Sequence, residues 1–351
     1  MDYRVLLYFP FGFIGGMGAY FIGLPMPFLL GGVFGAAVFV LSYERKGAQL
    51  PKLSRWVRLV FMSIIGSMIG SRFSPELLTL LPQFWISGLA IIPYILVAHA
   101  GSYAILRGLG KYERLDAYFA SLPGGIVDSA ALAESAGADL RIVTAQHFIR
   151  IILVVVTIPL LFFILSGETV GSMAGQSMAA VGYDITDVAL ILGIGLVGLL
   201  VGRAINLPVS HMMGPLIFSL ILSVTGVISI NLPDWLMHLA QFMIGTALGA
   251  QFSGMSRRLL VKGLGLGIMI GIYLLLIAVV MASVLMNYVP AGFEPLFISF
   301  AAGGLAEMSL IALSLNFNPV VVALHHLARI FLTIWIGLLM FRFGFKQESR
   351  P

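Results

Sequence analysis

The sequence predicts an all-α polytopic membrane protein with about ten transmembrane helices, arranged as two inverted five-helix repeats that each contain a re-entrant Gly-Gly hairpin. Three observations predict this fold class. The chain of 351 residues is 60% hydrophobic and only 10% charged, apolar runs of membrane-spanning length recur along it, and its second half repeats the pattern of the first. A transmembrane β-barrel would instead show alternating segments of about ten residues. We therefore expect a multi-pass protein of the bacterial inner membrane.

Long apolar runs, rich in Leu, Ile, Gly and Ala, predict the spanning helices in order. Those of the first half lie near 5–22, 28–42, 57–72, 84–106 and 140–165, and those of the second near 188–205, 213–229, 235–251, 264–287 and 319–341. The only long polar stretch is 166–187. The expected organisation is therefore a first membrane repeat at 1–165, a periplasmic linker at 166–187 and a second membrane repeat at 188–351.

The repeat is visible residue by residue at an offset of 179. The stretch LPGGIVDSAALAESAGADLRIVTAQHFIRI (122–151) aligns with AAGGLAEMSLIALSLNFNPVVVALHHLARI (301–330). This alignment pairs Gly124-Gly125 with Gly303-Gly304, Asp128 with Glu307, His147 with His326, and Arg150 with Arg329. The same offset pairs Gly66 and Gly70 with Gly245 and Gly249, small residues at a spacing that lets membrane helices pack closely. The pattern indicates a tandem duplication.

One segment of each half, roughly 116–137 in the first, decides how the halves are oriented. If it crosses the membrane, each half has an even number of spans and the halves are parallel. If it dips in and returns, each half has five spans and the halves are inverted. With both termini in the cytoplasm, the inverted arrangement places 17 of the 20 Lys and Arg residues on the cytoplasmic side, which the positive-inside rule favours. The parallel arrangement would instead place Arg72, Arg141, Arg203 and the group from Arg257 to Lys262 outside.

The predicted unwound tips are Pro123, Gly124 and Gly125 in the first copy and Gly303 and Gly304 in the second. Unwound backbone within a membrane is tolerated only where protein or water satisfies its N–H and C=O groups. Each tip precedes a short helix with an acid in its first turn, where free N–H groups and the positive end of the dipole also lie. Broken helices at corresponding positions of two inverted halves are typical of a transport site near the bilayer midplane.

The charged residues near the tips have two interpretations. Asp128 and Glu307 are candidates for a cation ligand, a proton site or a gate, because charges inside a membrane normally pair or serve a polar path. Arg150 and Arg329 would either form structural salt bridges with these acids or contact a substrate. His147 and His326 lie three residues before the arginines, on the same helix face. A lone histidine in a helix is usually a packing residue, but the repeated His-x-x-Arg beside a broken helix also makes these two candidates for a functional role.

A glycine pattern in the second half has a simpler interpretation. The run GIGLVG, with Gly193, Gly195 and Gly198, matches the letters of a dinucleotide-binding fingerprint. It lies inside an apolar span with no strand before it, so nucleotide binding is not expected.

The motifs resemble the AbrB family of membrane proteins over essentially the whole chain. The resemblance is carried by LPGGIVDSAA, SAGADLRIV, AAGGLAEMSL and the turn GLPMPFLLGG. The family motif is a PGG followed by Glu-Met. Here Ala302 replaces the proline of the second copy, and Asp128 and Ser129 replace glutamate and methionine in the first, so the two acids need not be equivalent. The resemblance implies one of two labels, an integral membrane regulator of gene expression or an ammonia monooxygenase.

Neither label finds support in the residues themselves. The six histidines show no Glu-x-x-His or His-x₃-His spacing for a copper or iron cluster, and the absence of cysteine excludes thiolate metal sites. The longest basic loop, 43–58, is too short for a DNA-binding module. We expect no enzyme activity, no cofactor, no metal site and no direct nucleic-acid contact.

The expected function is secondary transport or export of a small polar or charged solute, coupled to H⁺ or Na⁺. The expected partners are membrane lipid and that small-molecule or ion substrate, and a homo-oligomer is compatible with the sequence. The alternative is a non-transporting membrane regulator of gene expression that acts indirectly. The residues expected to bind substrate or ion are Pro123, Gly124, Gly125, Asp128, His147, Arg150, Gly303, Gly304, Glu307, His326 and Arg329.

Overall fold

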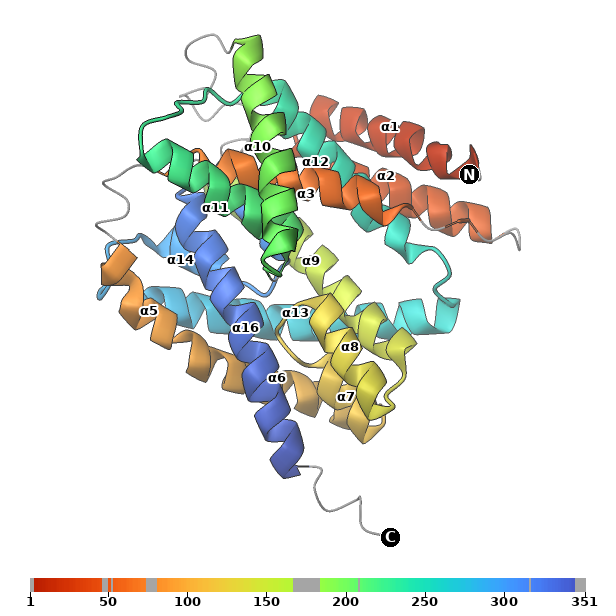
Figure 1. Cartoon of the computed structure of the whole chain (residues 1–351). Coiled ribbons are helices and arrows are strands. Elements are labelled where there is room, and N and C mark those ends of the chain that lie inside the picture. Colours follow the sequence, from red (N-terminus) through yellow and green to blue (C-terminus); the bar gives the residue numbers. More distant parts are fainter. Residues whose placement is uncertain are drawn as a thin grey trace. The chain divides into compact units, whose positions relative to one another are not determined.

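The computed structural model describes residues 3–45, 50–51, 53–73, 81–166, 184–207, 209–315 and 317–344. Most of the expected linker 166–187 lies outside these residues, and so do the side chains of several helix residues, Asp128 among them. Every regular element of the described residues is a helix (Figure 1). The predicted all-helical class is therefore confirmed.

Each predicted apolar run forms a helix, with boundaries shifted by a few residues. In the first half these are α1 (Tyr8–Phe21), which follows the 3₁₀ turn Tyr3–Leu7, then α2 (Pro27–Glu44), α3 (Arg55–Gly70), α5 (Trp85–Leu89) with α6 (Ile91–Gly108), and α9 (Leu140–Ser166). In the second half they are α10 (Ile185–Ala204), α11 (Ser210–Val224), α12 (Asp234–Gly249), α13 (Arg257–Leu285) and α16 (Pro319–Gly344).

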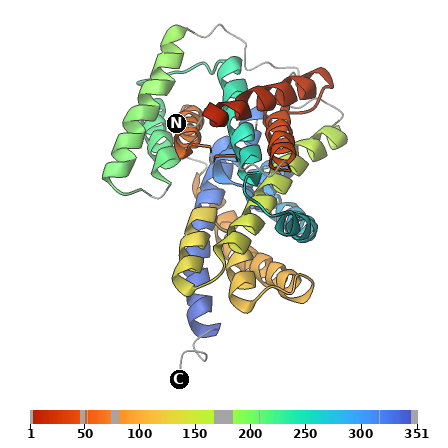
Figure 2. The ribbon, with the colours of Figure 1, turned by 90° about the vertical axis from the view of Figure 1, so that its right-hand side faces the viewer.

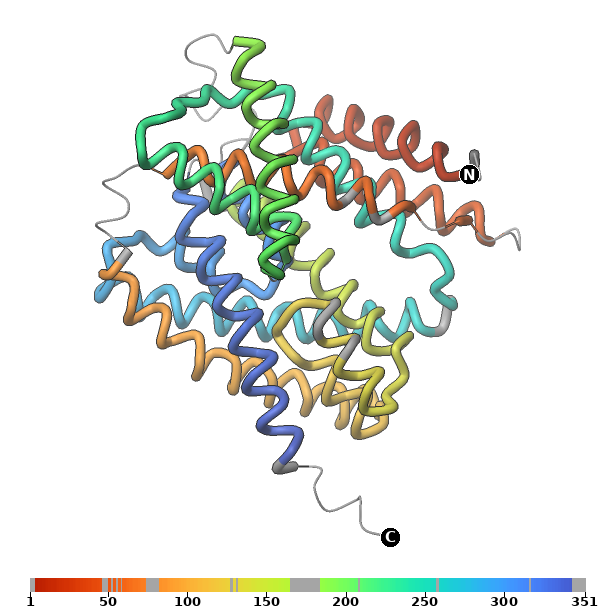
Figure 3. The backbone as a smooth tube through the Cα atoms, viewed as in Figure 1, coloured from red at the N-terminus to blue at the C-terminus, as the bar shows by residue number. Residues whose placement is uncertain are grey.

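The remaining segment of each half is a pair of short helices separated at the glycines. In the first half, α7 (Arg114–Ala120) and α8 (Ile126–Ala136) are separated by 121–125. In the second, α14 (Phe293–Phe300) and α15 (Leu305–Ser314) are separated by 301–304. The helices α7 and α8 pack against each other, and Figure 3 shows the chain turning between them. Both predicted helix breaks are present.

Local sequence signals set several helix ends. Pro27 opens α2, where its missing N–H would have had no helical partner. Asp184 and Asp187 form a reciprocal capping box at the start of α10. Gly137 ends α8 in the left-handed conformation, with a φ of 80°, which glycine adopts at little cost. These signals explain why the helices begin and end where they do within longer apolar runs.

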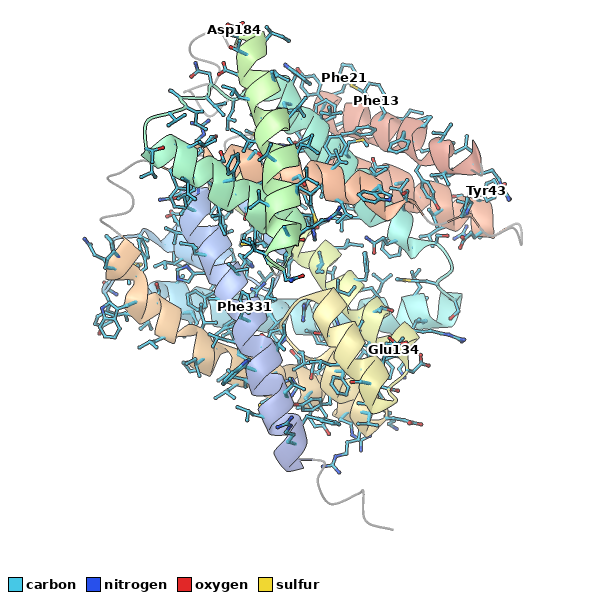
Figure 4. The ribbon with its side chains drawn as sticks, in the orientation of Figure 1. Phe13, Phe21, Tyr43, Glu134, Asp184 and Phe331 are labelled. Carbon is cyan, nitrogen blue, oxygen red and sulfur yellow. The ribbon has the colours of Figure 1, made fainter. Side chains whose placement is uncertain are left out.

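Several helices are suited to a membrane. Six helical stretches of the described residues are both long and apolar enough to cross one, so the prediction of about ten spans is not confirmed. The six are Pro27–Glu44, Pro82–Gly108, Leu140–Ile164, Ile185–Ala204, Leu259–Leu285 and Pro319–Arg342. Large apolar side chains also lie on the surface. Phe13 and Phe21 of α1 and Phe331 of α16 (Figure 4) are 51%, 78% and 44% exposed, an arrangement that suits lipid contact. The chain is therefore a membrane protein with several apolar helices.

The described residues form two compact units, and each unit takes helices from both halves of the sequence. The first unit contains α1 to α3, α10 to α12, the end of α9 and most of α15. The second contains α5 to α8, α13, α14, the first part of α9 and most of α16. The compact units therefore cut across the sequence repeats.

In the first unit, the third helix of each half packs against the first two helices of the other half. The helix α12 packs against α1 and α2, and α3 packs against α10 and α11, which lie side by side in Figure 2. Glycines allow the close approach. A Cβ added at Gly66 would lie 2.5 Å from the carbonyl oxygen of Met212 on α11, and a Cβ added at Gly245 would collide with the carbonyl oxygen of Leu29 on α2. Gly70 and Gly249 repeat these contacts one turn later. The predicted role of these glycines in helix packing is confirmed.

In the second unit, long helices surround the short ones. The helix α13 packs against both α6 and α14. The hydroxyl of Tyr118 on α7 donates a hydrogen bond of 2.6 Å to the carbonyl oxygen of Gly337 on α16. Gln146 on α9 donates a side-chain hydrogen bond of 2.9 Å to the hydroxyl of Tyr112, just before α7. These contacts fix α7 against α9 and α16, which carry the candidate histidines and arginines.

Candidate functional site

The candidate residues gather at two equivalent places. Each helix break is followed, after one short helix, by a long helix that carries a histidine and an arginine. His147 and Arg150 lie on α9, and His326 and Arg329 lie on α16. All four side chains are buried. Each arginine reaches the unwound tip of its own half.

Arg150 binds the backbone of the first tip. Its Nη1 donates to the carbonyl oxygen of Leu122 at 2.7 Å, and its Nη2 donates to the carbonyl oxygen of Gly124 at 3.1 Å. Residues 121–125 lie between helices, and a buried carbonyl without a partner is costly. The guanidinium group, which carries several N–H donors in one plane, supplies the partners that a continuous helix would have provided.

Arg329 binds the second tip in the same way. Its Nη1 donates to the carbonyl oxygen of Ala301 at 2.8 Å, and its Nη2 donates to that of Gly303 at 2.8 Å. The three residues correspond to Arg150, Leu122 and Gly124 by the repeat offset, because 329 − 150, 301 − 122 and 303 − 124 all equal 179. The internal duplication therefore preserves this contact atom by atom.

The two histidines differ in their contacts. His326 Nε2 lies 3.0 Å from the carbonyl oxygen of Ile298, to which it donates, so its Nδ1 is left as the acceptor for Nη2 of Arg329 at 2.7 Å. His326 thus positions the arginine of the second half. His147 instead donates from Nδ1 to the carbonyl oxygen of Val143 at 2.9 Å, and its buried Nε2 has no hydrogen-bond partner among the described residues. The two histidines of the duplicated His-x-x-Arg pattern therefore make different contacts.

The acids of the two halves can be described to different extents. Glu307 lies in the first turn of α15 and is 1% exposed, and neither of its carboxylate oxygens has a hydrogen-bond partner among the described residues. Asp128 lies in α8, but its side chain is outside what the structure describes, so its pairing with Arg150 stays a prediction. Backbone carbonyls accept hydrogen bonds from the Nη groups of both arginines, and the described residues do not test whether Asp128 also pairs with Arg150.

Two further residues lie near the tips and were not identified from the sequence. Tyr94 on α6 packs edge-on against Phe300, the last residue of α14, with ring centroids 5.5 Å apart. Thr333 on α16 lies against the first tip, since a Cβ added at Gly124 would be 2.8 Å from its Cγ2. The repeat offset pairs Tyr94 with Tyr273, and this pairing could have identified Tyr94 as a candidate from the sequence. Thr333 has no polar counterpart in the first half, so the repeat could not have identified it.

The second unit brings together buried positive charge, hydroxyl groups and unwound backbone at the two tips. In the part of the chain that is described, no group of three or more His, Asp or Glu side chains is placed to hold a metal ion.

The fold and the site together define a class, a helical membrane protein with two broken helices that are each held by a buried arginine of the following long helix. The chain belongs to the family described as "Transition state regulatory protein AbrB", whose profile matches residues 28–344. It is 26% identical to "Putative regulator AbrB" of Escherichia coli (strain K12) over 327 residues, which cover 92% of this chain and 91% of that protein. It is 23% identical to "Uncharacterized protein YhjN" of Bacillus subtilis (strain 168) over 317 residues, which cover 85% of this chain and 80% of that protein. The family resemblance seen in the sequence motifs is confirmed.

Proposed function

We propose that the chain is a secondary transporter of a small polar or charged solute, coupled to H⁺ or Na⁺. The observation that carries this proposal is the pair of broken helices at equivalent positions, each with its tip carbonyls bound by a buried arginine. Secondary transporters build their substrate and ion sites from such discontinuous helices. In this proposal the membrane is the bacterial inner membrane, and both termini are cytoplasmic.

The proposed architecture is ten spans in two inverted halves, with α7–α8 and α14–α15 as re-entrant hairpins. These four helices have 7, 11, 8 and 10 residues. At about 1.5 Å per residue, each of them extends at most about 17 Å, roughly half of a hydrocarbon core of about 30 Å. The packing of α7 against α8 supports a hairpin that returns to the side from which it entered. Five spans per half then give the halves opposite orientations, which the positive-inside charge pattern also supports.

Glu307 is the proposed site of the coupling ion. Its carboxylate is buried and unpartnered among the described residues. A lone carboxylate in apolar surroundings is costly unless it takes up a proton or a cation. Asp128 occupies the equivalent position of the first half and is assigned the same role.

Single cysteines test whether water reaches the tips, because the chain contains no cysteine of its own. Ser129→Cys in α8 and Met308→Cys in α15 place a thiol beside each acid, at positions that are buried in this structure. A membrane-impermeant thiol reagent is applied to oriented vesicles from each face, with Ser172→Cys in the linker as the topology control. A transporter that opens alternately to the two sides is expected to show labelling at both tip positions, and the linker is expected to react only from outside.

Matched controls lie one turn further along the same short helices. Ala133→Cys in α8 and Ala312→Cys in α15 are fully buried and should stay protected. Protection of Ser129→Cys and Met308→Cys as well would mean that the arginines only hold the fold together, and the transporter proposal would then be wrong.

The name of one relative, "Putative regulator AbrB", favours a second candidate, a membrane regulator that does not transport. This candidate predicts that Glu307→Gln leaves the regulatory output unchanged, while changes in the basic cytoplasmic loops abolish it. Loss of solute flux in Glu307→Gln would favour transport. Enzyme activity is not part of the proposal, and stoichiometric copper or iron in the purified protein would contradict that exclusion.

A further inference from the structure

The two tips and their arginines meet at α16 within the second unit. The first tip touches the helix that carries Arg329, because a Cβ added at Gly124 would lie 2.8 Å from Cγ2 of Thr333 and one added at Gly337 would lie 3.1 Å from Cδ2 of Leu122. Tyr94 packs against Phe300, which precedes Ala301, the residue whose carbonyl oxygen binds Arg329. The arginines and Tyr94 are buried, and these contacts join them to the two tips in one cluster.

The positive charge of this cluster is not balanced by the described residues. Arg150 and Arg329 are each 3% exposed, and their described partners are four backbone carbonyls, one imidazole and the uncharged hydroxyl of Tyr94. Carbonyl and imidazole acceptors satisfy N–H groups but bring no net negative charge. Two like charges in apolar surroundings are costly unless an anion compensates them.

Unused hydrogen-bond donors in the same cluster point to a ligand. The Nε–H groups of Arg150 and Arg329 and the hydroxyl of Thr333 are buried, and none has a hydrogen-bond partner among the described residues. The hydroxyl oxygen of Tyr94 lies against the guanidinium of Arg329, which can only donate, so the O–H of Tyr94 is still available as a donor. Buried donors are normally satisfied by protein or by a bound group. An anion with several oxygen acceptors would satisfy these donors and balance the two charges together.

Resting on the proposed transport function, we infer that Arg150, Arg329 and Tyr94 bind the transported solute, and that this solute is a small dianion with its charges on oxygen atoms, such as a dicarboxylate. Two guanidinium charges match two negative charges, and charge-assisted hydrogen bonds from guanidinium groups favour oxygen acceptors. Since each arginine also binds one tip, the ligand would lie where the two halves of the repeat meet within this unit.

Thermal unfolding of the purified full chain in detergent tests this site. The probes are sodium succinate, sodium sulfate and sodium chloride, at equal sodium concentration and with ionic strength equalised by choline chloride. Succinate is expected to raise Tm in a saturable manner, whereas chloride is not. An equal response to sulfate would show that one divalent oxyanion suffices, and a response to succinate alone would assign the site to dicarboxylates. Dianions that stabilise no more than chloride would overturn the inference.

Two variants on α6 keep the test specific and leave the arginine–carbonyl contacts in place. Tyr94→Phe removes a hydroxyl of the cluster and should weaken the apparent succinate affinity about tenfold, the effect of losing one hydrogen bond to a charged group. Ser102→Ala, two turns further along, also removes a buried hydroxyl without a described partner and should leave the affinity unchanged. Full succinate stabilisation in Tyr94→Phe would place any anion site elsewhere and overturn the inference.

The outcomes distinguish this inference from the transport proposal on which it rests. If the thiol reagent labels the tips but dianions do not raise Tm, the transport proposal stands and the dianion substrate class is rejected. Dianion binding with fully protected tips would establish the anion site and reject transport.

Discussion

Gly198 is predicted to be required for the packing of α10 against α11, whereas Gly193, on the same helix, is not. A Cβ added at Gly198 would lie 2.5 Å from Cα and 2.6 Å from N of Pro215 on α11, while a Cβ at Gly193 would have no atom within 4 Å. Both residues lie inside α10, so replacement by alanine changes the intrinsic helix propensity equally. The pair therefore isolates the packing contact.

The expected size of the effect follows from these distances. Carbon atoms pack at about 3.5–4.0 Å, so Gly198→Ala requires the two helices to separate by about 1 Å, because the colliding atoms belong to the backbone. Overpacking of this kind costs about 1–3 kcal/mol. Alanine gains up to about 1 kcal/mol in helix propensity over glycine at either position. The two variants should thus differ in stability by about 1–3 kcal/mol.

Thermal unfolding of the detergent-purified protein, followed by the fluorescence of its four tryptophans, measures this difference. Gly198→Ala should lower Tm, and Gly193→Ala should leave it unchanged or raise it. Gly195→Ala, whose Cβ would lie 3.4 Å from Oγ of Ser67, should fall between them. Equal Tm values for Gly198→Ala and Gly193→Ala would refute the conclusion that a glycine contact sets the distance between α10 and α11.

Two further predictions concern single contacts. Gly124→Ala should lower the stability of the protein by about 1–3 kcal/mol, because its Cβ would meet Cγ2 of Thr333 at 2.8 Å. Adding Thr333→Ala should restore part of the loss in Tm, and purely additive losses would show that the two residues are not coupled. Glu44→Ala should lower the stability by about 1–3 kcal/mol, since the carboxylate accepts hydrogen bonds from Oγ of Ser253 at 2.8 Å and from N–H of Gly254 at 3.0 Å. Glu44→Gln keeps one acceptor oxygen and should lower the stability less. An unchanged Tm in both variants would contradict this role of Glu44.

The two halves are equivalent at the tips and differ around them. The arginine–carbonyl contacts recur at the same offset, whereas the contacts of the neighbouring tyrosines do not. The hydroxyl of the buried Tyr94 lies against the guanidinium of Arg329, while its counterpart Tyr273 donates a hydrogen bond of 2.7 Å to the carbonyl oxygen of Val97. The duplication therefore explains how the tips are held, but equivalent residues around them make different contacts.

The sequence by itself determined the helical membrane class, the order of the apolar helices, the two breaks and the family. These properties depend on composition, on glycine and proline at fixed positions and on self-similarity, all of which can be read along the chain. It also placed Arg150 and Arg329 beside the tips, because they follow the breaks at a constant distance.

Only the tertiary structure decided what those arginines bind and which helices pack together. The contact of Arg150 with Leu122 joins residues 28 apart, so it depends on how the short helix folds back. The hydrogen bond from Oγ of Ser63 on α3 to the carbonyl oxygen of His211 on α11 joins residues 148 apart. No local sequence pattern predicts that the third helix of one half packs against the first two helices of the other half. This packing follows from the fit of glycine faces in three dimensions.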